Sequence, residues 1–377
     1  MKNFGILLGL SLFTATAFGG HKNTAVAATD APALERCGPA KIKEILAKPT
    51  RKNPSVRIDC STFLSKGDVV TKRVEFVGPK SSNAIFNCGG GKILRSAIAR
   101  SSFEFTVLVK SQRVEGKWTR PENVSIRNCT ITGGVHIMGM GFNGEASAVR
   151  TSSRKRGHTE RVQAAAPKNI NLDRVKIDGL GSIALYASPG VTGLKLRKSK
   201  IYGESRSVAI YLDAESAHHV ISDNVINVSN PRELIAVDGA AHTIIARNRF
   251  SNLNNGGIYL YRNCGEGGTI RHQAPQRNHI VGNHFYYNKF SGRKISGINF
   301  VKNLNFRIPA IWIGQRNGKR PYCSHDKGYA FGSSKSDASF ADNNIVKNNQ
   351  IVKLKAKLMI INDGKNNIVS GNKTVKR

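Results

Sequence analysis

The residues with the clearest capacity for chemistry are polar and aromatic side chains at the ends of short, alternating apolar segments. One such segment, GGIYLYRNCGEGG, alternates as a β-strand does and places Tyr259 and Tyr261 on one face, directly before Arg262. Two earlier segments of the same kind end in Asp213 and Asp238. Carboxylates, phenols and a guanidinium brought to one place would be suited to acid–base chemistry on a polar substrate.

Two kinds of reaction fit these side chains. Hydrolysis of a glycosidic bond uses two carboxyl groups, and we expect those of Asp213 and Asp238 to lie about 5 Å apart, closer to a retaining than to an inverting pair. β-Elimination from a uronic acid, or epimerisation at its C5, needs a cation for the sugar carboxylate, and Arg262 and Arg271 are the candidates. The candidates for the base and the acid of that reaction are Tyr259, Tyr261 and His272.

The carboxylate pair has two further interpretations. A hard cation such as calcium could bind there, with Glu215 or Asn263 as additional oxygen ligands. Alternatively, the aspartates only form ion pairs with neighbouring lysines and arginines, which is the most frequent case. The cysteines show no paired CxxC spacing, so we expect no zinc site, and no metal ligand or cofactor is assigned.

These residues are far apart in the sequence, so a repeating fold is needed to bring them together. The pattern I-x-x-N-x-[IF] recurs with a period of about 24 residues, for example as ISDNVI and IARNRF. Its fourth position is occupied in successive copies by Cys129, Val175, Ser199, Asn224, Asn248, Asn283, Asn348 and Asn372. A second short strand follows each copy and leaves no room for helices. The pattern therefore predicts a solenoid of β-coils with asparagines stacked at one corner.

Two other repeat folds fit less well. The L-x-x-L-x-L-x-x-N pattern of leucine-rich repeats is missing, and a propeller needs a longer period. Residues 55–377 resemble the right-handed parallel β-helix repeat proteins of bacterial exports. The resemblance implies an all-β, single-stranded right-handed parallel β-helix, a fold on which lyases, epimerases and hydrolases all occur. Because the D-P-H-[DE] motif of mannuronan C5-epimerases is absent, the resemblance assigns no catalytic residue.

The second strands of successive coils predict a functional face. Neighbouring coils of a β-helix lie about 4.8 Å apart, so equivalent residues form columns. One outward column contains Tyr186, Tyr211, Ala236, Tyr259, Trp312 and Ile360, and the column two residues later contains Ser188, Asp213, Asp238, Tyr261, Gly314 and Asn362. We expect sugar rings to stack on Tyr186, Tyr211 and Trp312, with Arg271 nearby. The alternative is structural, since aromatic residues also favour sheets without any ligand.

The chain is predicted to contain one folded domain after a signal peptide. Residues 1–28 have a lysine, an apolar run and small residues, the layout of a cleaved signal peptide, and no later segment is apolar enough to cross a bilayer. Residues 29–54 include PAKIKEILAK, a short amphipathic helix suited to capping the first coil. The β-helix occupies 55–377, with insertions at 141–168, 264–276 and 287–341. We expect the first insertion to be a mobile, projecting loop.

The six cysteines fit an oxidising compartment. Cys37 and Cys60 flank the predicted capping helix and are expected to form one disulfide bond. Cys264 and Cys323 fall in the second and third insertions, where a bond between them would help to wall a groove. The sequence does not decide whether the remaining two cysteines pair.

The composition is strongly basic, with 58 Lys and Arg against 24 Asp and Glu and a formal net charge of +34. Such an excess indicates a polyanionic partner, either an acidic polysaccharide or an anionic envelope surface. Export argues against a nucleic acid, and no nucleic-acid motif is present. We therefore predict a secreted or periplasmic protein that acts on an acidic polysaccharide by β-elimination or related uronate chemistry. The alternatives are a non-catalytic protein that binds glycan or the envelope, and a glycoside hydrolase with paired aspartates.

Overall fold

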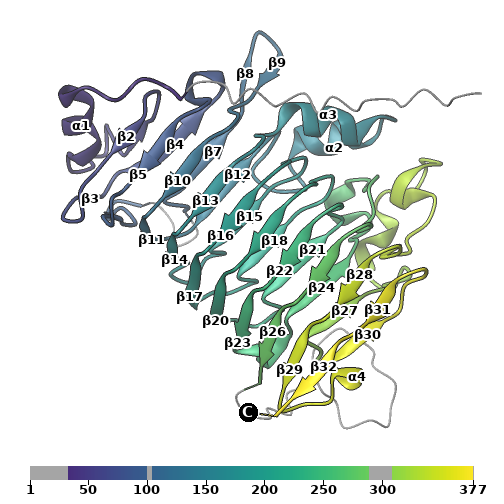
Figure 1. Ribbon diagram of the computed structural model, residues 1–377. Helices are drawn as coiled ribbons and strands as arrows, with labels where there is room; N and C mark the ends of the chain where they lie inside the picture. Colours follow the sequence, from purple (N-terminus) through teal and green to yellow (C-terminus); the bar gives the residue numbers. More distant parts are fainter. Residues whose placement is uncertain (1–32, 100–103, 288–307, 377) are drawn as a thin grey trace, which may run out of the picture. The chain divides into compact units, whose positions relative to one another are not determined.

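The protein is a right-handed parallel β-helix in which each coil contributes one strand to each of three sheets (Figure 1). The structure is a computed structural model and describes residues 33–99, 104–287 and 308–376. The predicted signal peptide and the beginning of the third insertion lie outside these residues. The three parallel sheets confirm the predicted all-β fold.

In the described part of the chain, each of the three sheets contains ten strands, and neighbouring strands are parallel. The first sheet consists of β1 (Ser55–Arg57), β4 (Arg73–Val77), β7 (Val107–Lys110), β12 (Val135–Met138), β15 (Leu185–Ala187), β18 (Ile210–Leu212), β21 (Ile235–Asp238), β24 (Ile258–Tyr261), β27 (Ile311–Ile313) and β30 (Ile360–Asn362). The second consists of β2 (Thr62–Phe63), β5 (Ile85–Asn87), β10 (Ser125–Arg127), β13 (Asn171–Asp173), β16 (Lys195–Arg197), β19 (Val220–Ser222), β22 (Ile244–Ala246), β25 (His279–Val281), β28 (Ile345–Lys347) and β31 (Ile368–Ser370). The third consists of β3 (Val69–Val70), β6 (Lys92–Ile93), β11 (Thr130–Thr132), β14 (Lys176–Asp178), β17 (Lys200–Glu204), β20 (Val225–Ser229), β23 (Arg249–Ser251), β26 (His284–Tyr286), β29 (Gln350–Val352) and β32 (Lys373–Val375).

Short elements outside the sheets cap the coils or lie in the connections. They are the hairpin strands β8 (Gln112–Val114) and β9 (Lys117–Thr119), the helices α1 (Pro39–Leu46), α2 (Ser147–Ser153), α3 (His158–Ala165) and α4 (Ala356–Met359), and the 3-10 turns Pro79–Ser81, Leu253–Asn255, Glu266–Gly268, Pro321–Ser324 and Gly332–Ser334.

The recurring I-x-x-N-x-[IF] pattern covers two strands and the corner between them. In ISDNVI, the first residues belong to β19 of the second sheet and the last to β20 of the third. Asp223 at the corner has a φ of 62°, the left-handed backbone that Asp and Asn adopt more readily than most residues. The strand that follows each copy belongs to the first sheet, so a full coil has three strands.

Asparagines stack at this corner, as the pattern predicts. Oδ1 of Asn248 accepts hydrogen bonds from the backbone N and Nδ2 of Asn224, at 3.0 and 2.9 Å, and Oδ1 of Asn283 accepts from Asn248 in the same way. The following members of this ladder are Asn349 and Asn372. Each buried side-chain amide therefore has hydrogen-bond partners on the neighbouring coil, which offsets the free-energy cost of burying polar groups.

The predicted ladder is wrong by one residue in one coil. Asn349 takes the position assigned to Asn348, because Val346 rather than Ile345 pairs with the buried Ile280. A second ladder, at the corner between the first and second sheets, was not expected from the sequence. Its members are Asn278, Asn344 and Asn367.

Helix α1 covers the start of the β-helix, as predicted. Pro39 occupies its first turn, where a missing N–H costs no intrahelical hydrogen bond. Ile45 is fully buried and belongs to the main apolar cluster inside the coils. A disulfide bond between Cys37 and Cys60 ties the segment before α1 to the first coil. The helix therefore closes the apolar interior at this end.

The other cysteines also form disulfide bonds. Cys88 and Cys129, which the sequence left undecided, join the corners that follow β5 and β10. Cys264 and Cys323 join the second insertion to the third. This last pair is the one expected to hold the two insertions together beside the first sheet.

The first insertion is not a simple projecting loop, because it contains α2 and α3 and makes hydrogen bonds to two other segments. Ser153 Oγ accepts from the backbone N of Ile270 at 3.0 Å, and Ser153 O accepts from His272 Nε2 at 2.7 Å. Gln163 Nε2 donates to Glu215 O at 2.8 Å. The first and second insertions therefore form one layer beside the first sheet.

Candidate functional site

The outward residues of the first sheet form an aromatic column. Tyr186 pairs with Tyr211 on the next coil, and further along the sheet Tyr259 pairs with Trp312. The column begins one coil earlier than the sequence suggested, since His136 pairs with Tyr186 and its ring stacks on that tyrosine at 4.7 Å. The spacing of the inward Leu and Ile residues was sufficient to align Tyr186, Tyr211, Tyr259 and Trp312.

The predicted register differs from the structure in the last coil. Ile361, not Ile360, pairs with Trp312. Asp363 consequently takes the position assigned to Asn362, and its Oδ2 accepts a hydrogen bond of 2.7 Å from Trp312 Nε1. The error arises because four apolar residues in succession, LMII, give no alternation that distinguishes the two faces.

Two tyrosines are tied to aspartates on the following coils. Tyr186 Oη donates to Asp213 Oδ2 at 2.7 Å, and Tyr211 Oη donates to Asp238 Oδ2 at 2.6 Å. The rings of Tyr186 and Tyr211 meet edge to face with their centroids 5.3 Å apart. The phenol hydroxyls thus fix the orientation of both rings against the sheet.

Asp238 is a fully satisfied, buried carboxylate. In addition to Tyr211, it accepts hydrogen bonds from the backbone N of Asn263 at 2.8 Å and from Asn263 Nδ2 at 2.6 Å. Its side chain is not exposed to solvent. Asn263 Oδ1 in turn accepts from Arg316 and, at 2.9 Å, from Tyr322 Oη. Asp238 therefore anchors the start of the second insertion, and no donor-free oxygen faces outward.

Asp213 is also buried, but its carboxyl group accepts fewer hydrogen bonds than that of Asp238. It accepts from the backbone N of Ala214 at 2.8 Å, and Arg271 Nη1 lies 3.7 Å from its Oδ1. Burial raises the pKa of Asp213 to about 6, Arg271 opposes that rise, and the nearby Asp238 adds to it. A carboxyl group with this pKa is partly protonated near neutral pH, as a general acid must be.

The tyrosines of this face are poor candidates for a base. Burial, with further contributions from neighbouring carboxylates, raises the pKa of four phenols well above the ordinary value; they are Tyr186, Tyr211, Tyr259 and Tyr261. A base in β-elimination must be deprotonated at the working pH, which requires a shift in the opposite direction. The phenols can donate hydrogen bonds but do not supply a phenolate.

Tyr261 belongs to a polar network that the sequence did not reveal. Its hydroxyl donates to Glu233 Oε1 at 2.8 Å and accepts from Arg232 Nη2 at 2.7 Å. The guanidinium of Arg316 lies 3.6 Å from the centre of its ring. Glu233 precedes β21 by two residues, and one step back along the outward column from Ala236 is the buried Leu234, so the predicted columns did not indicate it.

The basic residues proposed for catalysis hold the insertions in place. Arg262 Nη2 donates to the backbone oxygens of Ser336 and Ala338, at 2.6 and 2.8 Å, and burial lowers its pKa to about 10. Arg271 is buried beside Asp213. His272 donates its backbone N to Glu215 at 2.6 Å, in addition to the contact of its ring with the first insertion. The arginine at the end of β24 therefore has a structural role, because its hydrogen bonds hold the third insertion against the first sheet.

The accessible aromatic surface is confined to one end of the column. Tyr259 and Trp312 are 3% and 5% exposed, so neither offers a ring face to a polymer. Tyr186 and Tyr211 are half-buried. Phe142, from the first insertion, is 56% exposed and contacts the ring of His136 at 5.0 Å. Of the predicted stacking residues, the structure therefore leaves two available and adds a phenylalanine.

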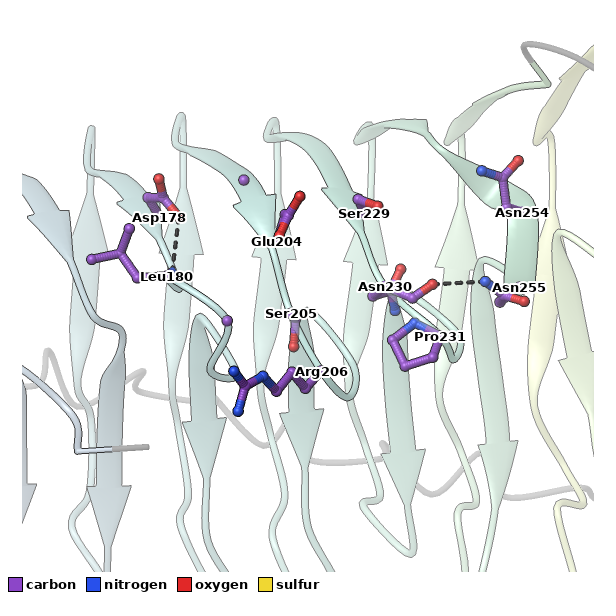
Figure 2. Close-up of a pocket in the computed structure, with 12 residues that line it drawn as sticks. Asp178, Leu180, Glu204, Ser205, Arg206, Ser229, Asn230, Pro231, Asn254 and Asn255 are labelled. Atoms are coloured by element: carbon purple, nitrogen blue, oxygen red, sulfur yellow. Dashed lines mark hydrogen bonds between the residues drawn. The ribbon is translucent and has the colours of Figure 1, made fainter. Parts of the chain in front are cut away.

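An open cleft of about 830 Å³ lies at the corner between the third and first sheets (Figure 2). Figure 2 shows the side chain of Asp178 accepting from the backbone N of Leu180, and Asn255 donating to the backbone oxygen of Asn230. The cleft is lined by Asp178, Leu180, Gly181, Gly203, Glu204, Ser205, Arg206, Ser229, Asn230, Pro231, Asn254 and Asn255. It contains none of the predicted site residues.

Comparison with known proteins supports the fold and the compartment. A family model described as "Periplasmic copper-binding protein (NosD)" matches residues 119–305. The match supports a parallel β-helix and confirms the prediction of a secreted or periplasmic protein. No curated protein matches the chain. Among the described residues, none of the helices has the length and apolar character needed to cross a membrane.

One solved structure is similar over most of the chain. It is the DFA-IIIase from Arthrobacter chlorophenolicus A6 in complex with GF2, with 13% sequence identity and a TM-score of 0.30. The similarity covers 89% of this chain and 82% of the other. At this level of similarity it does not bear on the function.

Proposed function

We propose that this secreted or periplasmic β-helix protein binds an acidic polysaccharide along the first sheet, at the surface formed by Phe142, Tyr186 and Tyr211. The observation that carries the proposal is the pair of tyrosine rings on adjacent coils, half-buried and each fixed by a hydrogen bond to a buried aspartate. Sugar rings stack their apolar C–H faces on aromatic rings, and a ring that is already oriented loses little entropy on binding.

The charge of the chain supports an acidic polymer over a neutral one. The formal net charge is +34, and such a field raises the local concentration of polyanions. Arg232 is half-buried, acts electrostatically on Tyr211, hydrogen-bonds Tyr261 and forms an ion pair with Glu233 at 2.9 Å. A guanidinium in this position is suited to a carboxylate or sulfate group on the polymer.

Cleavage of the polymer is a second candidate function, favoured by the raised pKa of Asp213. A protonated Asp213 could act as the general acid in hydrolysis of a glycosidic bond. This reaction fits the site better than elimination, which would need a tyrosine as the base. Gly144 lies directly over the site, since a Cβ at this residue would come within 3.0 Å of Asp213 Oδ2 and 2.6 Å of Arg271 Nη1. The loop around Gly144 must move before a substrate reaches Asp213, so binding is the leading proposal.

The described residues do not fit the copper named in the description of the NosD family. All cysteines in the described part form disulfide bonds, so no thiolate is available. No group of three or more His, Cys, Asp or Glu residues is arranged there to hold a metal ion. His136 is enclosed by the rings of Phe105, Tyr186 and Phe142, and its Nε2 lies 2.7 Å from Ser188 Oγ. We derive no step through a metal.

The calcium interpretation meets a similar difficulty. Glu215 Oε1 accepts from the backbone N of His272, and its Oε2 accepts from the backbone N of Gln273 at 3.0 Å. Asn263 presents N–H groups, not oxygen, to Asp238. A cation would have to displace these donors from the carboxylates, which leaves buried N–H groups without partners.

Binding can be measured by fluorescence anisotropy with labelled oligogalacturonate and oligoalginate, and with a neutral glucan as reference. Tyr186→Ala and Tyr211→Ala should each weaken binding of the acidic oligosaccharide about tenfold, which corresponds to the loss of one ring contact. Trp118→Ala, which removes a half-buried aromatic ring from the β8–β9 hairpin, is the matched control. Unchanged affinity in both tyrosine variants would refute binding on the first sheet.

Turnover is tested separately with the same polymers. New reducing ends without ultraviolet absorbance would indicate hydrolysis, whereas absorbance from an unsaturated sugar would indicate elimination. Asp213→Asn should abolish hydrolysis while binding is retained. Absence of both products leaves binding as the function.

A further inference from the structure

Basic residues that are scattered along the sequence line up on the outer face of the third sheet. One outward position of each strand forms a continuous column, because every neighbouring pair of strands is in register there. From β6 to β32 the column contains Lys92, Thr130, Lys176, Lys200, Val225, Arg249, His284, Gln350 and Lys373. We call its five permanent cations, Lys92, Lys176, Lys200, Arg249 and Lys373, the cationic ladder.

The ladder is exposed and is not neutralised by the protein. All five side chains are exposed. Within the described part of the chain, none forms an ion pair with a carboxylate, in contrast to Arg247, which lies 2.7 Å from Asp223 at the neighbouring corner. Lys176 and Lys200 are directly opposite each other on adjacent strands. Like charges in this position destabilise a sheet, so the fold itself does not account for the arrangement.

Aromatic rings accompany two of the cations. The ammonium of Lys200 lies 5.3 Å from the centre of the Tyr202 ring, and the guanidinium of Arg249 lies 5.2 Å from that of Tyr286. Both tyrosines point outward from the same sheet and are half-buried, and each lies two positions after a residue of the column, Lys200 on β17 or His284 on β26. Each pair therefore presents a ring face beside a positive charge.

The sheet surface is hollowed at one of these pairs. A cavity of about 310 Å³ lies there, and Arg249, Tyr286 and Lys353 contribute a ring and two cations to its lining. The remaining lining residues are Val225, Phe250, Ser251, Tyr287 and Val352. A sugar ring that carries a carboxylate would find an aromatic face, a guanidinium and an ammonium within this one depression.

We propose that the cationic ladder is a second binding surface, on which a linear uronate polymer lies parallel to the axis of the β-helix. The proposal rests on the proposed function for the identity of the polymer, but it concerns a different sheet and different residues. The charges form a line across the coils, which matches a linear polymer that carries one charge on each sugar. An anionic membrane would instead be expected to meet basic residues mixed with several exposed apolar anchors. Among the described residues of this column, the exposed large apolar side chains are Val225 and, beside Lys92 on β3, Val69.

The test compares two triple variants of equal charge. One carries Lys176→Gln, Lys200→Gln and Arg249→Gln on the ladder, and the control carries Lys48→Gln, Lys80→Gln and Lys117→Gln at exposed lysines of other segments. The probe is a long labelled oligogalacturonate at low salt. The ladder variant should bind about tenfold more weakly than the control, because three surface charge contacts are lost. The dependence of its affinity on salt should also be shallower, since fewer charges remain to be screened.

The outcomes separate this proposal from the first-sheet proposal. Equal affinity of the two triple variants would overturn the ladder, whatever the tyrosine variants of the first sheet show. A loss in the ladder variant together with normal binding by both Tyr186→Ala and Tyr211→Ala would support the ladder and refute the first-sheet surface. Vesicles containing phosphatidylglycerol are the final probe. If the ladder variant loses vesicle binding but binds oligogalacturonate as the control does, the surface is a membrane contact and the proposal is wrong.

Discussion

Tyr211 on β18 donates a hydrogen bond of 2.6 Å to Asp238 at the end of β21, so a phenol on one coil is tied to the carboxylate of the next. The contact of Tyr186 with Asp213 repeats it one coil earlier. Because each phenol also supplies ring surface to the proposed glycan site, the orientation of the rings and the satisfaction of the buried carboxylates depend on each other.

Removing one phenol hydroxyl should measurably destabilise the protein. Tyr211→Phe leaves the ring in place but deprives the buried carboxylate of Asp238 of one donor, so the free energy of unfolding should fall by about 1.5–3 kcal/mol. Urea denaturation measures the change. Tyr329→Phe is the control, because this half-buried ring packs against Phe331 in the third insertion and should change stability by less than about 0.5 kcal/mol. Equal stability of the two variants would show that the bond contributes nothing.

The raised pKa of Asp213 predicts a pH dependence of stability. Between the ordinary value of 3.8 and about 6, the folded state holds a proton that the unfolded state has released. The free energy of unfolding should therefore fall as the pH rises through this window, by about 3 kcal/mol in total, and should not fall further above it on account of this group. Asp213→Asn cannot ionise, so its stability profile should be flatter there.

The matched control for this profile is Asp223→Asn. Asp223 is exposed, and its hydrogen bonds to Arg247 lower its pKa, so the control should retain the fall that Asp213 produces. Urea denaturation across the acidic range distinguishes the cases. A profile as steep in Asp213→Asn as in the wild-type protein would contradict the assignment.

The repeat determined which parts of the site could be predicted from the sequence. Tyr186, Tyr211 and Trp312 were placed in one column because each follows an inward Leu or Ile at a fixed distance within its coil. The same reasoning failed at Ile360 and at Asn348, where consecutive residues of one type hide the alternation. The register is thus predictable wherever one face is clearly apolar.

The cover of the site could not be predicted, because the insertions do not repeat. Nothing in the sequence indicated that Arg262 would donate hydrogen bonds to the backbone of Ser336 and Ala338. The hydrogen bonds from Asn263 to the carboxylate of Asp238 were equally unexpected. The cationic ladder is the opposite case. Its residues are four lysines and one arginine that lie one to three coils apart, and their alignment is evident only when the register of the third sheet is known.

The bond between Cys264 and Cys323 should stabilise the insertions more than the coils. It closes a loop with a sequence separation of 59 residues, and its loss should destabilise that region by about 2–4 kcal/mol. In the double variant Cys264→Ser, Cys323→Ser, limited proteolysis with mass spectrometry should reveal new cleavage in the second and third insertions. The corresponding double variant at Cys37 and Cys60 should instead expose the segment around α1. Absence of new cleavage in the insertions would contradict this role.

The asparagine ladder should contribute more in its middle than at its end. Asn248 accepts two hydrogen bonds from Asn224, donates to Asn283 and donates at 2.8 Å to the backbone oxygen of Ile221. Asn248→Ala breaks all of these inside the coils and leaves buried donors and an acceptor unpaired, so the free energy of unfolding should fall by about 2–4 kcal/mol. Asn372→Ala, in the terminal coil, removes a less buried member that has a neighbour on one side only, and should cost about half as much. Urea denaturation compares the two variants. If they are equally destabilised, the ladder acts as a set of independent corner contacts rather than as a continuous support for the stack.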